Sequence, residues 1–435
     1  MSLYELCDAI DNACALPYLI GFFGIGIFVT LQTRFIQFRA FPLFIKLLSR
    51  GIKHHHVTKN EQSINPFKAL LTSMATTIGM GNIVGPAIAI STGGPGALFW
   101  LVIYSFFGAA TKFAEIIFSI NMRTRLQSGK LLGGPAQYLR FVSPFLAVWY
   151  ASITVLLFSS WSAVQANTLA TIYHLESIPQ WATGLGLATI LFLVLLGGIV
   201  RIGEIASKLV PLMFVLYVFF TFSILLSDIP ALIQAFKLIF HHAFSGAAAT
   251  GGFLGATVIK AMHCGVQRNI FITEAGLGTS SVAHAMADTD KPAEQAVLGM
   301  FSIIADTLLA LLSGLLVVAT GVWSQGTFSN TAIYEIFKTY SPGVGKWVLL
   351  LSISLFVITT IIGNSFNGSQ SFASFTKYRF MIWYYLGVAA AVFIGAYTAV
   401  PTIWKVMDVL LICVAVPHVI GLFILSIRRS DLLKF

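Results

Sequence analysis

Two apolar segments that are interrupted by glycine constrain this chain more than any other feature. The first reads IGMGNIVGP at residues 78–86, and the second reads TEAGLG at residues 273–278. A broken helix leaves backbone NH and CO groups that are tolerated at membrane depth only where they line a cavity inside the protein. Two such breaks, at corresponding places in two halves of a chain, are typical of a secondary transporter with a midplane binding site. The sequence therefore predicts a protein that carries a small solute across a membrane.

The composition supports this prediction and excludes a soluble protein. Of 435 residues, 57% are hydrophobic and only 10% are charged, whereas soluble domains carry about 25% charged residues. The formal net charge of +10 comes from basic residues in short connections between apolar runs, where they set membrane topology. We therefore expect an all-α polytopic membrane protein with no nucleic-acid partner.

Apolar runs of about 20 residues mark the expected membrane spans. About eleven are expected, near residues 13–33, 66–92, 96–121, 144–172, 181–200, 205–228, 248–284, 294–323, 345–366, 380–400 and 403–426. The run at 248–284 is long because it would hold two half-helices and the break between them.

The basic residues give the expected orientation of these spans. Those that follow the odd-numbered spans include Arg34, Arg39, Lys46, Arg50, Arg123, Arg125, Lys130, Arg140, Arg201, Lys208, Lys291, Lys377, Arg379, Arg428 and Arg429. Because basic loops stay in the cytoplasm, this pattern places the N-terminus outside and the C-terminus inside. A multi-pass protein of the cytoplasmic (inner) cell membrane is expected.

The spans divide into one helix and two groups of five, each of which opens with a glycine-broken segment. Because five is odd, the second group would insert with the opposite orientation, as in an inverted repeat. The expected parts of this one integral membrane domain are residues 1–62, 63–230 and 231–435. The first holds an N-terminal span with a basic cytoplasmic loop, and the other two are the five-helix repeats.

The first break carries candidate ligands for both an anion and a cation. Gly79 and Gly81 permit unwinding and a close approach of the backbone, and Asn82 offers both a donor and an acceptor. A second half-helix that begins near Ile83 would turn free NH groups toward a substrate carboxylate. The first half-helix would end near Thr76, and its carbonyl groups suit a cation. The alternative is a glycine-lined helix crossing without a ligand.

The second break contains Glu274, an ionisable residue at membrane depth and therefore a functional candidate. It can bind a substrate ammonium group, coordinate a cation indirectly, or cap the free NH groups of the broken helix. Thr273, Gly276 and Phe271 accompany it, and Phe271 can shape or gate an apolar pocket.

Other polar residues of the spans are weaker candidates. Glu115 and Lys112 lie one turn apart, which favours a paired interface, and Asp306 is expected to stabilise neighbouring polar groups. Thr359 and Thr360 offer hydroxyl oxygens suited to Na⁺, although threonine in a helix more often bonds its own backbone.

Several stretches resemble the alanine or glycine:cation symporters, also called sodium:alanine symporters. They are GMGNIVGPAIAISTGGPGALFW at 79–100, GGPAQYL at 133–139, EAGLGTSSVAHA at 274–285 and KPAEQAVLGM at 291–300, together with the pair Asp306-Thr307. This resemblance implies the leucine-transporter (LeuT-like) fold, with one extra helix before ten core helices. It also implies import of a small neutral amino acid coupled to Na⁺, less often to H⁺, without an organic cofactor.

The resemblance assigns roles to individual residues. Gly79, Gly81 and Asn82 would contact the carboxylate and amino groups of the substrate, and Phe271 would help to cover it. Thr359 and Thr360, with carbonyl groups near Thr76 and Gly79, would hold the sodium ion.

The chain departs from the family pattern at two places. In the second break, Thr273 replaces the usual asparagine before Glu274. In the ninth span, Asn364 stands where the family usually has a tryptophan, which leaves room for a larger or more polar substrate side chain. Amino acids other than alanine and glycine are therefore also candidate substrates.

The remaining alternatives are a proton-coupled transporter, an uncoupled facilitator or exchanger, and an intramembrane enzyme. An enzyme would need paired carboxylates or a nucleophile with a base at membrane depth. Glu274 and Asp306 are the one acidic pair worth considering, and no nucleophile accompanies them. The chain is thus expected not to be an enzyme, and its expected partners are the amino acid and the lipid bilayer, with no obligate protein partner.

Overall fold

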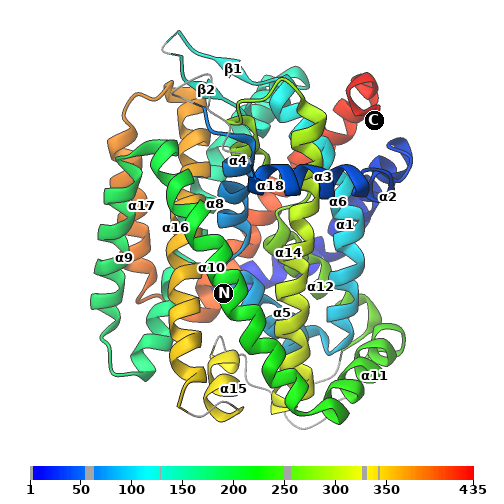
Figure 1. Cartoon of the computed structure of the whole chain (residues 1–435), viewed down its shortest axis with the longest axis vertical. Coiled ribbons are helices and arrows are strands. Elements are labelled where there is room, and N and C mark those ends of the chain that lie inside the picture. The colour runs from blue at the N-terminus through cyan, green and yellow to red at the C-terminus, as the bar shows by residue number, and fades with distance from the viewer. Residues whose placement is uncertain (1–2, 54–62, 128, 248–255, 326–330, 341–342) are drawn as a thin grey trace.

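The computed structural model describes residues 3–53, 63–127, 129–247, 256–325, 331–340 and 343–435 as a bundle of helices (Figure 1). Within these residues, eight helical segments are long and apolar enough to cross a membrane, namely Tyr4–Gln32, Pro66–Gly93, Gly96–Asn121, Pro144–Leu175, Gly198–Ser227, Pro292–Ala319, Gly345–Thr376 and Thr402–Arg428. Two shorter apolar helices, Gln180–Leu195 and Met381–Gly395, accompany them. The chain is therefore a multi-pass membrane protein. The count of about eleven spans, the inverted repeat and the division after residues 62 and 230 stay predictions.

The helices follow one another with short connections. In chain order they are α1 (Leu3–Gln32), α2 (Ile36–Arg39), α3 (Phe41–Lys53), α4 (Pro66–Thr77), α5 (Met80–Gly93), α6 (Gly96–Asn121), α7 (Pro135–Tyr138), α8 (Pro144–Leu175), α9 (Gln180–Leu195), α10 (Gly198–Ser227), α11 (Ile229–Ser245), α12 (Val258–Thr273), α13 (Ser281–Ala285), α14 (Pro292–Ala319), α15 (Ala332–Tyr340), α16 (Gly345–Thr376), α17 (Met381–Gly395) and α18 (Val400–Arg428). Short 3₁₀ turns lie at Leu139–Phe141, Val322–Gln325 and Ser430–Leu433. Two short strands, β1 (Thr124–Arg125) and β2 (Leu131–Leu132), pair antiparallel.

Some predicted bounds differ from the structure. The connection expected at 34–65 contains α2 and α3, and its residues 54–62 lie outside the described part of the chain, as do residues 248–255 of the expected seventh span. The ninth span extends to Thr376, beyond the predicted residue 366, because the polar residues of its last turns are buried within the bundle. Amphipathic helices such as α11 were not predicted, because they contain no continuous apolar run of the length that marks a membrane span.

The first glycine-rich segment is broken, as predicted. α4 ends at Thr77 and α5 begins at Met80, and Ile78 and Gly79 between them have extended backbone angles. The second half-helix begins earlier than the predicted Ile83. The reason is that the Asn82 side chain accepts a hydrogen bond from the Gly79 backbone NH and so starts the helix at Met80.

The second segment is also broken and is more irregular. α12 ends where Glu274 adopts a left-handed conformation with φ of 58°, and the short α13 begins only at Ser281. Gly276 and Gly278 have φ of 92° and 75°, which glycine adopts without the steric cost that a side chain would impose. The local sequence therefore determines where the helix stops.

The two breaks lie side by side inside the bundle. α5 packs against α12 and α14, while α4 packs against α10, α13 and α16. The Ser73 hydroxyl of α4 donates a hydrogen bond to the Ser280 carbonyl oxygen in the second break (3.2 Å). Figure 1 shows α3 and the β1–β2 pair at one end of the bundle and α11 and α15 at the other.

Candidate functional site

Glycine at the first break allows two neighbouring helices to approach its backbone closely. A Cβ atom at Gly79 would collide with the side chain of Thr360 on α16, and one at Gly81 would collide with the ring of Phe271 on α12. The Thr360 hydroxyl donates a hydrogen bond to the Ile78 carbonyl oxygen (3.0 Å). The structure therefore brings four of the predicted site residues together at one place.

Asn82 holds the first break in shape. Its Oδ1 accepts a hydrogen bond from the Gly79 NH (2.9 Å), and its Nδ2 donates to the Asp306 carbonyl oxygen on α14 (3.2 Å). The Met80 NH, the next donor of the helix start, is bonded to Oε1 of Gln165 on α8 (3.1 Å). Gln165 was not predicted from the sequence. The signal that could have indicated it is the presence of a polar residue inside an apolar span.

The two adjacent threonines of α16 point to different neighbours. The Thr359 hydroxyl donates to the carbonyl oxygens of Leu355 and Phe356 and contacts the Met213 sulfur of α10 (3.4 Å). The structure does not bring this hydroxyl to the first break, where that of Thr360 lies. Thr76, the predicted end of the first half-helix, bonds the Ser73 carbonyl oxygen.

Glu115 of α6 caps the second break. Its Oε1 accepts hydrogen bonds from the backbone NH groups of Gly276 (2.8 Å) and Gly278 (3.1 Å), and the residue is completely buried. The sequence analysis offered this capping role to Glu274 and expected Glu115 to pair with Lys112. In the structure Lys112 is instead paired with Asp306, and Glu115 accepts the hydrogen bonds of the second break.

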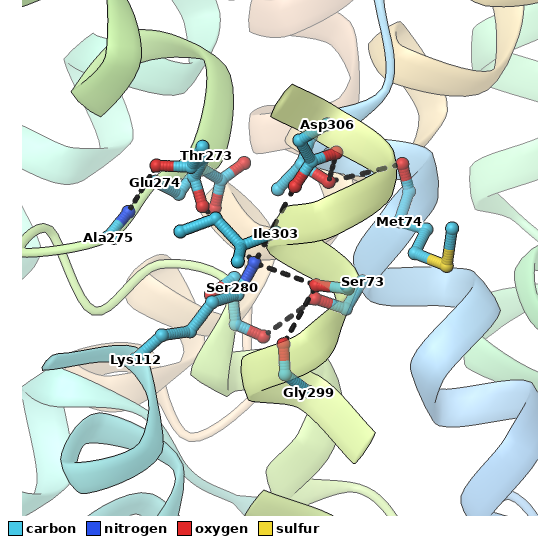
Figure 2. Close-up of polar contacts among 12 residues, drawn as sticks. Ser73, Met74, Lys112, Thr273, Glu274, Ala275, Ser280, Gly299, Ile303 and Asp306 are labelled. Carbon is cyan, nitrogen blue, oxygen red and sulfur yellow. Dashed lines mark hydrogen bonds and ion pairs between the residues drawn. The ribbon is translucent and has the colours of Figure 1, made fainter. Parts of the chain in front are cut away.

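Lys112 lies at the centre of a buried polar cluster that joins α6, α14 and both breaks (Figure 2). Its Nζ donates to the Thr273 carbonyl oxygen (3.2 Å) and to the Ser302 hydroxyl (3.0 Å), and lies 3.9 Å from Oδ2 of Asp306. Thr77 of α4 donates to Oδ1 of Asp306 (2.9 Å). The stabilising role expected for Asp306 is consistent with these contacts.

Glu274 borders the same cluster at the start of the second break. One carboxylate oxygen accepts a hydrogen bond from the Thr279 hydroxyl, and the other, Oε1, has no partner within the described residues. A fully buried carboxylate oxygen without a donor is costly to maintain. Glu274 therefore presents an unused acceptor for a cation or an ammonium group.

An ion pair and three aromatic rings close the bundle on one side of the breaks. Arg268 of α12 and Asp408 of α18 lie 2.7 Å apart. In the same region, the ring of Phe271 stacks on the ring of Trp161 (centroids 4.6 Å apart) and contacts the ring of Trp404 (centroids 5.3 Å apart).

Two cavities are lined in part by helices of the site. One of about 230 Å³ is lined by polar and charged residues that include Asp11, Cys264, Arg268 and Asp408. The other, of about 410 Å³, lies toward the end that carries β2 and is lined by residues that include Leu131, Met286, Ser369, Gln370 and Tyr378. Each cavity thus adjoins a helix that contributes to the breaks, α12 for the smaller cavity and α16 for the larger one.

Comparison with known proteins agrees with this architecture. The chain matches the sodium:alanine symporter family over residues 1–434. It is 32% identical over 432 residues to an uncharacterised transporter of Haemophilus influenzae, covering 97% of this chain and 93% of that protein. It is also 32% identical over 440 residues to the sodium/alanine symporter AgcS of Methanococcus maripaludis, covering 98% and 95%. A probable sodium/glutamine symporter, GlnT of Bacillus subtilis, is 30% identical and covers 92% and 84%.

Solved structures with a similar fold are distant in sequence. MhsT in complex with L-phenylalanine superposes with a TM-score of 0.61 at 14% identity, covering 85% of this chain and 90% of MhsT. Mhp1, a nucleobase-cation-symport-1 family transporter, superposes with a TM-score of 0.56 at 14% identity, covering 86% and 82%. These likenesses establish the LeuT-like transporter fold.

Proposed function

The chain belongs to the sodium:alanine symporter family, and on this premise we propose that it imports a small neutral amino acid together with Na⁺ by alternating access. The observation that carries the proposal is the meeting of two broken helices at Gly79, Gly81, Phe271 and Thr360. Two relatives are named as a sodium/alanine and a probable sodium/glutamine symporter, so both alanine and glutamine are candidate substrates.

The substrate would lie across the two breaks. The N-terminus of α5 at Gly79–Gly81 presents the positive end of a helix dipole and suits the carboxylate. The end of α12 at Thr273 and the free oxygen of Glu274 suit the ammonium group. Asn82 would stabilise the backbone conformation of the first break, and Gly276 that of the second. Phe271 would cover the substrate on the side closed by Arg268 and Asp408.

The ion would lie beside the substrate at the first break. Unwound carbonyl groups and the C-terminal ends of half-helices coordinate coupling ions in transporters of this kind. The Thr360 hydroxyl already lies 3.0 Å from the Ile78 carbonyl oxygen, and Thr76 and Gly79 border the same place. These oxygen ligands support Na⁺ as the coupling ion.

Replacing Thr360 by valine is expected to raise the Na⁺ concentration for half-maximal uptake by about tenfold or more, because one hard oxygen ligand is lost at nearly unchanged side-chain volume. Thr359→Val is the matched control, and we expect it to have a much smaller effect because its hydroxyl bonds its own helix. The measurement is uptake into proteoliposomes at a series of Na⁺ concentrations, from which the half-maximal concentration is obtained for each variant. Equal shifts in both variants would mean that Thr359 is also a ligand, as the sequence predicts.

Replacing Asp408 by asparagine is expected to open the closed side of the protein. Removing one partner of a buried ion pair costs about 3–5 kcal/mol, so the closed arrangement loses stability. Cys264 lines the cavity next to this pair, and its labelling by a membrane-impermeant thiol reagent should rise about tenfold. The assay uses a background in which Cys7, Cys14 and Cys413 are replaced by serine.

Asp431→Asn is the control for this experiment, since its carboxylate pairs with exposed Arg429 at the chain terminus. Unchanged labelling in Asp408→Asn would exclude the ion pair as a gate. The reagent is added from outside intact cells, so labelling of Cys264 also tests the proposed orientation. In that orientation the protein lies in the inner membrane, with its N-terminus outside and its C-terminus in the cytoplasm.

Uptake of labelled amino acids into proteoliposomes, with and without an inward Na⁺ gradient, tests the proposed function as a whole. Na⁺-driven accumulation of alanine, glycine or another neutral amino acid supports it, and exchange without accumulation contradicts it. Proton coupling is the second candidate, and the observation that favours it is the buried Lys112–Asp306 pair. Accumulation driven by a pH gradient alone would select that alternative.

A further inference from the structure

The half of α16 that follows Thr360 carries a polar stripe. Asn364, Asn367 and Ser371 follow Thr360 at intervals of four, three and four residues, a spacing that places all of them on one helix face. All four side chains are buried, Asn364 and Asn367 completely. Neither carboxamide has a hydrogen-bond partner at its oxygen or its nitrogen within the described residues.

Contacts on both sides of the stripe show where it points. Gly363 lies against Thr76 of α4, and Gly368 lies against Tyr384 of α17 and Phe158 of α8. With 3.6 residues per turn, the directions of Asn364 and Asn367 fall between those of Gly363 and Gly368. The two carboxamides therefore face the interior between α4 and α8, on the side of α16 to which Thr360 also belongs.

The rest of the circumference of α16 has different neighbours, with Ser369 opposite the stripe and Phe366 and Gln370 between the two. Phe366, Ser369 and Gln370 line the cavity of about 410 Å³, and the carboxamide of Gln370 is bonded to the Tyr378 hydroxyl (2.7 Å). The Ser365 hydroxyl, which lies toward the Ser369 side, also has no partner within the described residues, but the two carboxamides of α16 that lack partners both lie on the face of Thr360.

Two unpartnered carboxamides in a protein interior require a physical reason, because buried polar groups are almost always hydrogen-bonded. Each carboxamide offers two donors and two acceptors, so its natural complement is a group that both donates and accepts. We infer that Asn364 and Asn367 bind the uncharged polar side chain of the transported amino acid, and that a carboxamide amino acid is preferred over alanine. This inference rests on the proposed function.

The position of the pair determines which side chain can reach it. At about 1.5 Å per residue, Asn364 lies about 6 Å and Asn367 about 10 Å from Thr360 along the helix axis. The methyl group of alanine, attached directly to Cα, stays near the breaks and leaves both carboxamides unpaired. A carboxamide carried on two methylene groups extends toward the next helical turn. A charged side chain is disfavoured because the stripe itself carries no charge to balance it.

Competition between glutamine and alanine for Na⁺-driven uptake into proteoliposomes tests this inference. We expect wild-type protein to prefer glutamine by about tenfold or more, since sites built to hydrogen-bond a substrate group discriminate against analogues that lack it. Asn364→Leu and Asn367→Leu keep the side-chain volume and should each lower the glutamine-to-alanine ratio by about tenfold. Ser369→Ala, on the opposite face of α16, should leave the ratio unchanged.

The outcomes separate this inference from the proposed function. Na⁺-driven uptake that favours alanine, or a ratio unaffected by both leucine variants, overturns the inference and leaves the transporter in place. No Na⁺-driven uptake of any amino acid overturns both. Thermal stabilisation of the detergent-solubilised wild-type protein by glutamine or alanine, each with Na⁺, needs no variant. Greater stabilisation by glutamine supports the inference, and equal or smaller stabilisation contradicts it.

Discussion

Glu115→Leu is expected to abolish transport and to destabilise the folded protein. Leucine has nearly the same size, but it cannot accept the hydrogen bonds that Glu115 receives from the Gly276 and Gly278 NH groups. A buried donor that loses its partner costs about 1–3 kcal/mol, so two such donors cost about 2–6 kcal/mol. This amount is comparable to a large part of the stability of a typical domain. The second break would lose its fixed shape.

The measurement combines Na⁺-driven uptake per amount of reconstituted protein with thermal unfolding in detergent. Glu115→Gln keeps one acceptor oxygen and should retain a substantial part of both activity and stability. Glu294→Leu is the matched surface control, because Glu294 pairs with exposed Lys291 at the start of α14. Wild-type uptake in Glu115→Leu would show that the break is held by other contacts.

The positions of the breaks could be predicted from the sequence because their causes are local. Gly79 and Gly81 lack the side chains that would obstruct neighbouring helices, and Gly276 and Gly278 adopt left-handed angles. The family resemblance, carried by the motifs around them, further indicated the fold. Such features need no knowledge of how distant helices pack.

The partners of the breaks could not be predicted, since they come from other parts of the chain. Glu115 is separated from Gly276 by 161 residues, and no local pattern connects them. Adjacent positions also differ in ways that the sequence does not reveal. Thr359 and Thr360 form one motif, yet they face α10 and the first break respectively because successive helix residues point about 100° apart.

Amphipathic segments illustrate a different limit. α11 and α15 were not expected, because continuous apolar runs indicate membrane spans but not helices that combine polar and apolar faces. The N-cap Asp228, followed by Pro230 at the start of α11, is a local signal that could have located that helix.

Asn82→Ala is expected to reduce Na⁺-driven uptake about 30-fold or more while the protein remains inserted in the membrane. Alanine removes the cap on the Gly79 NH and the hydrogen bond to the Asp306 carbonyl oxygen, both of them buried. Losing about 1–3 kcal/mol at each of the two groups, about 2–6 kcal/mol together, corresponds to a fall of about 30-fold or more in the population of the binding geometry. Asn82→Asp keeps the acceptor for Gly79 but loses the donor, so its uptake should be intermediate.

Ser91→Ala is the control for Asn82, because the Ser91 hydroxyl near the far end of α5 donates to the Ile88 carbonyl oxygen of its own helix. Membrane insertion is measured by the yield of monodisperse protein after detergent extraction, and uptake is normalised to that yield. A loss of uptake with normal yield means that Asn82 holds the geometry in which substrate and ion bind. Full uptake in Asn82→Ala would mean that the first break forms its binding geometry without this side chain, and the assignment of the substrate carboxylate to α5 would then fail.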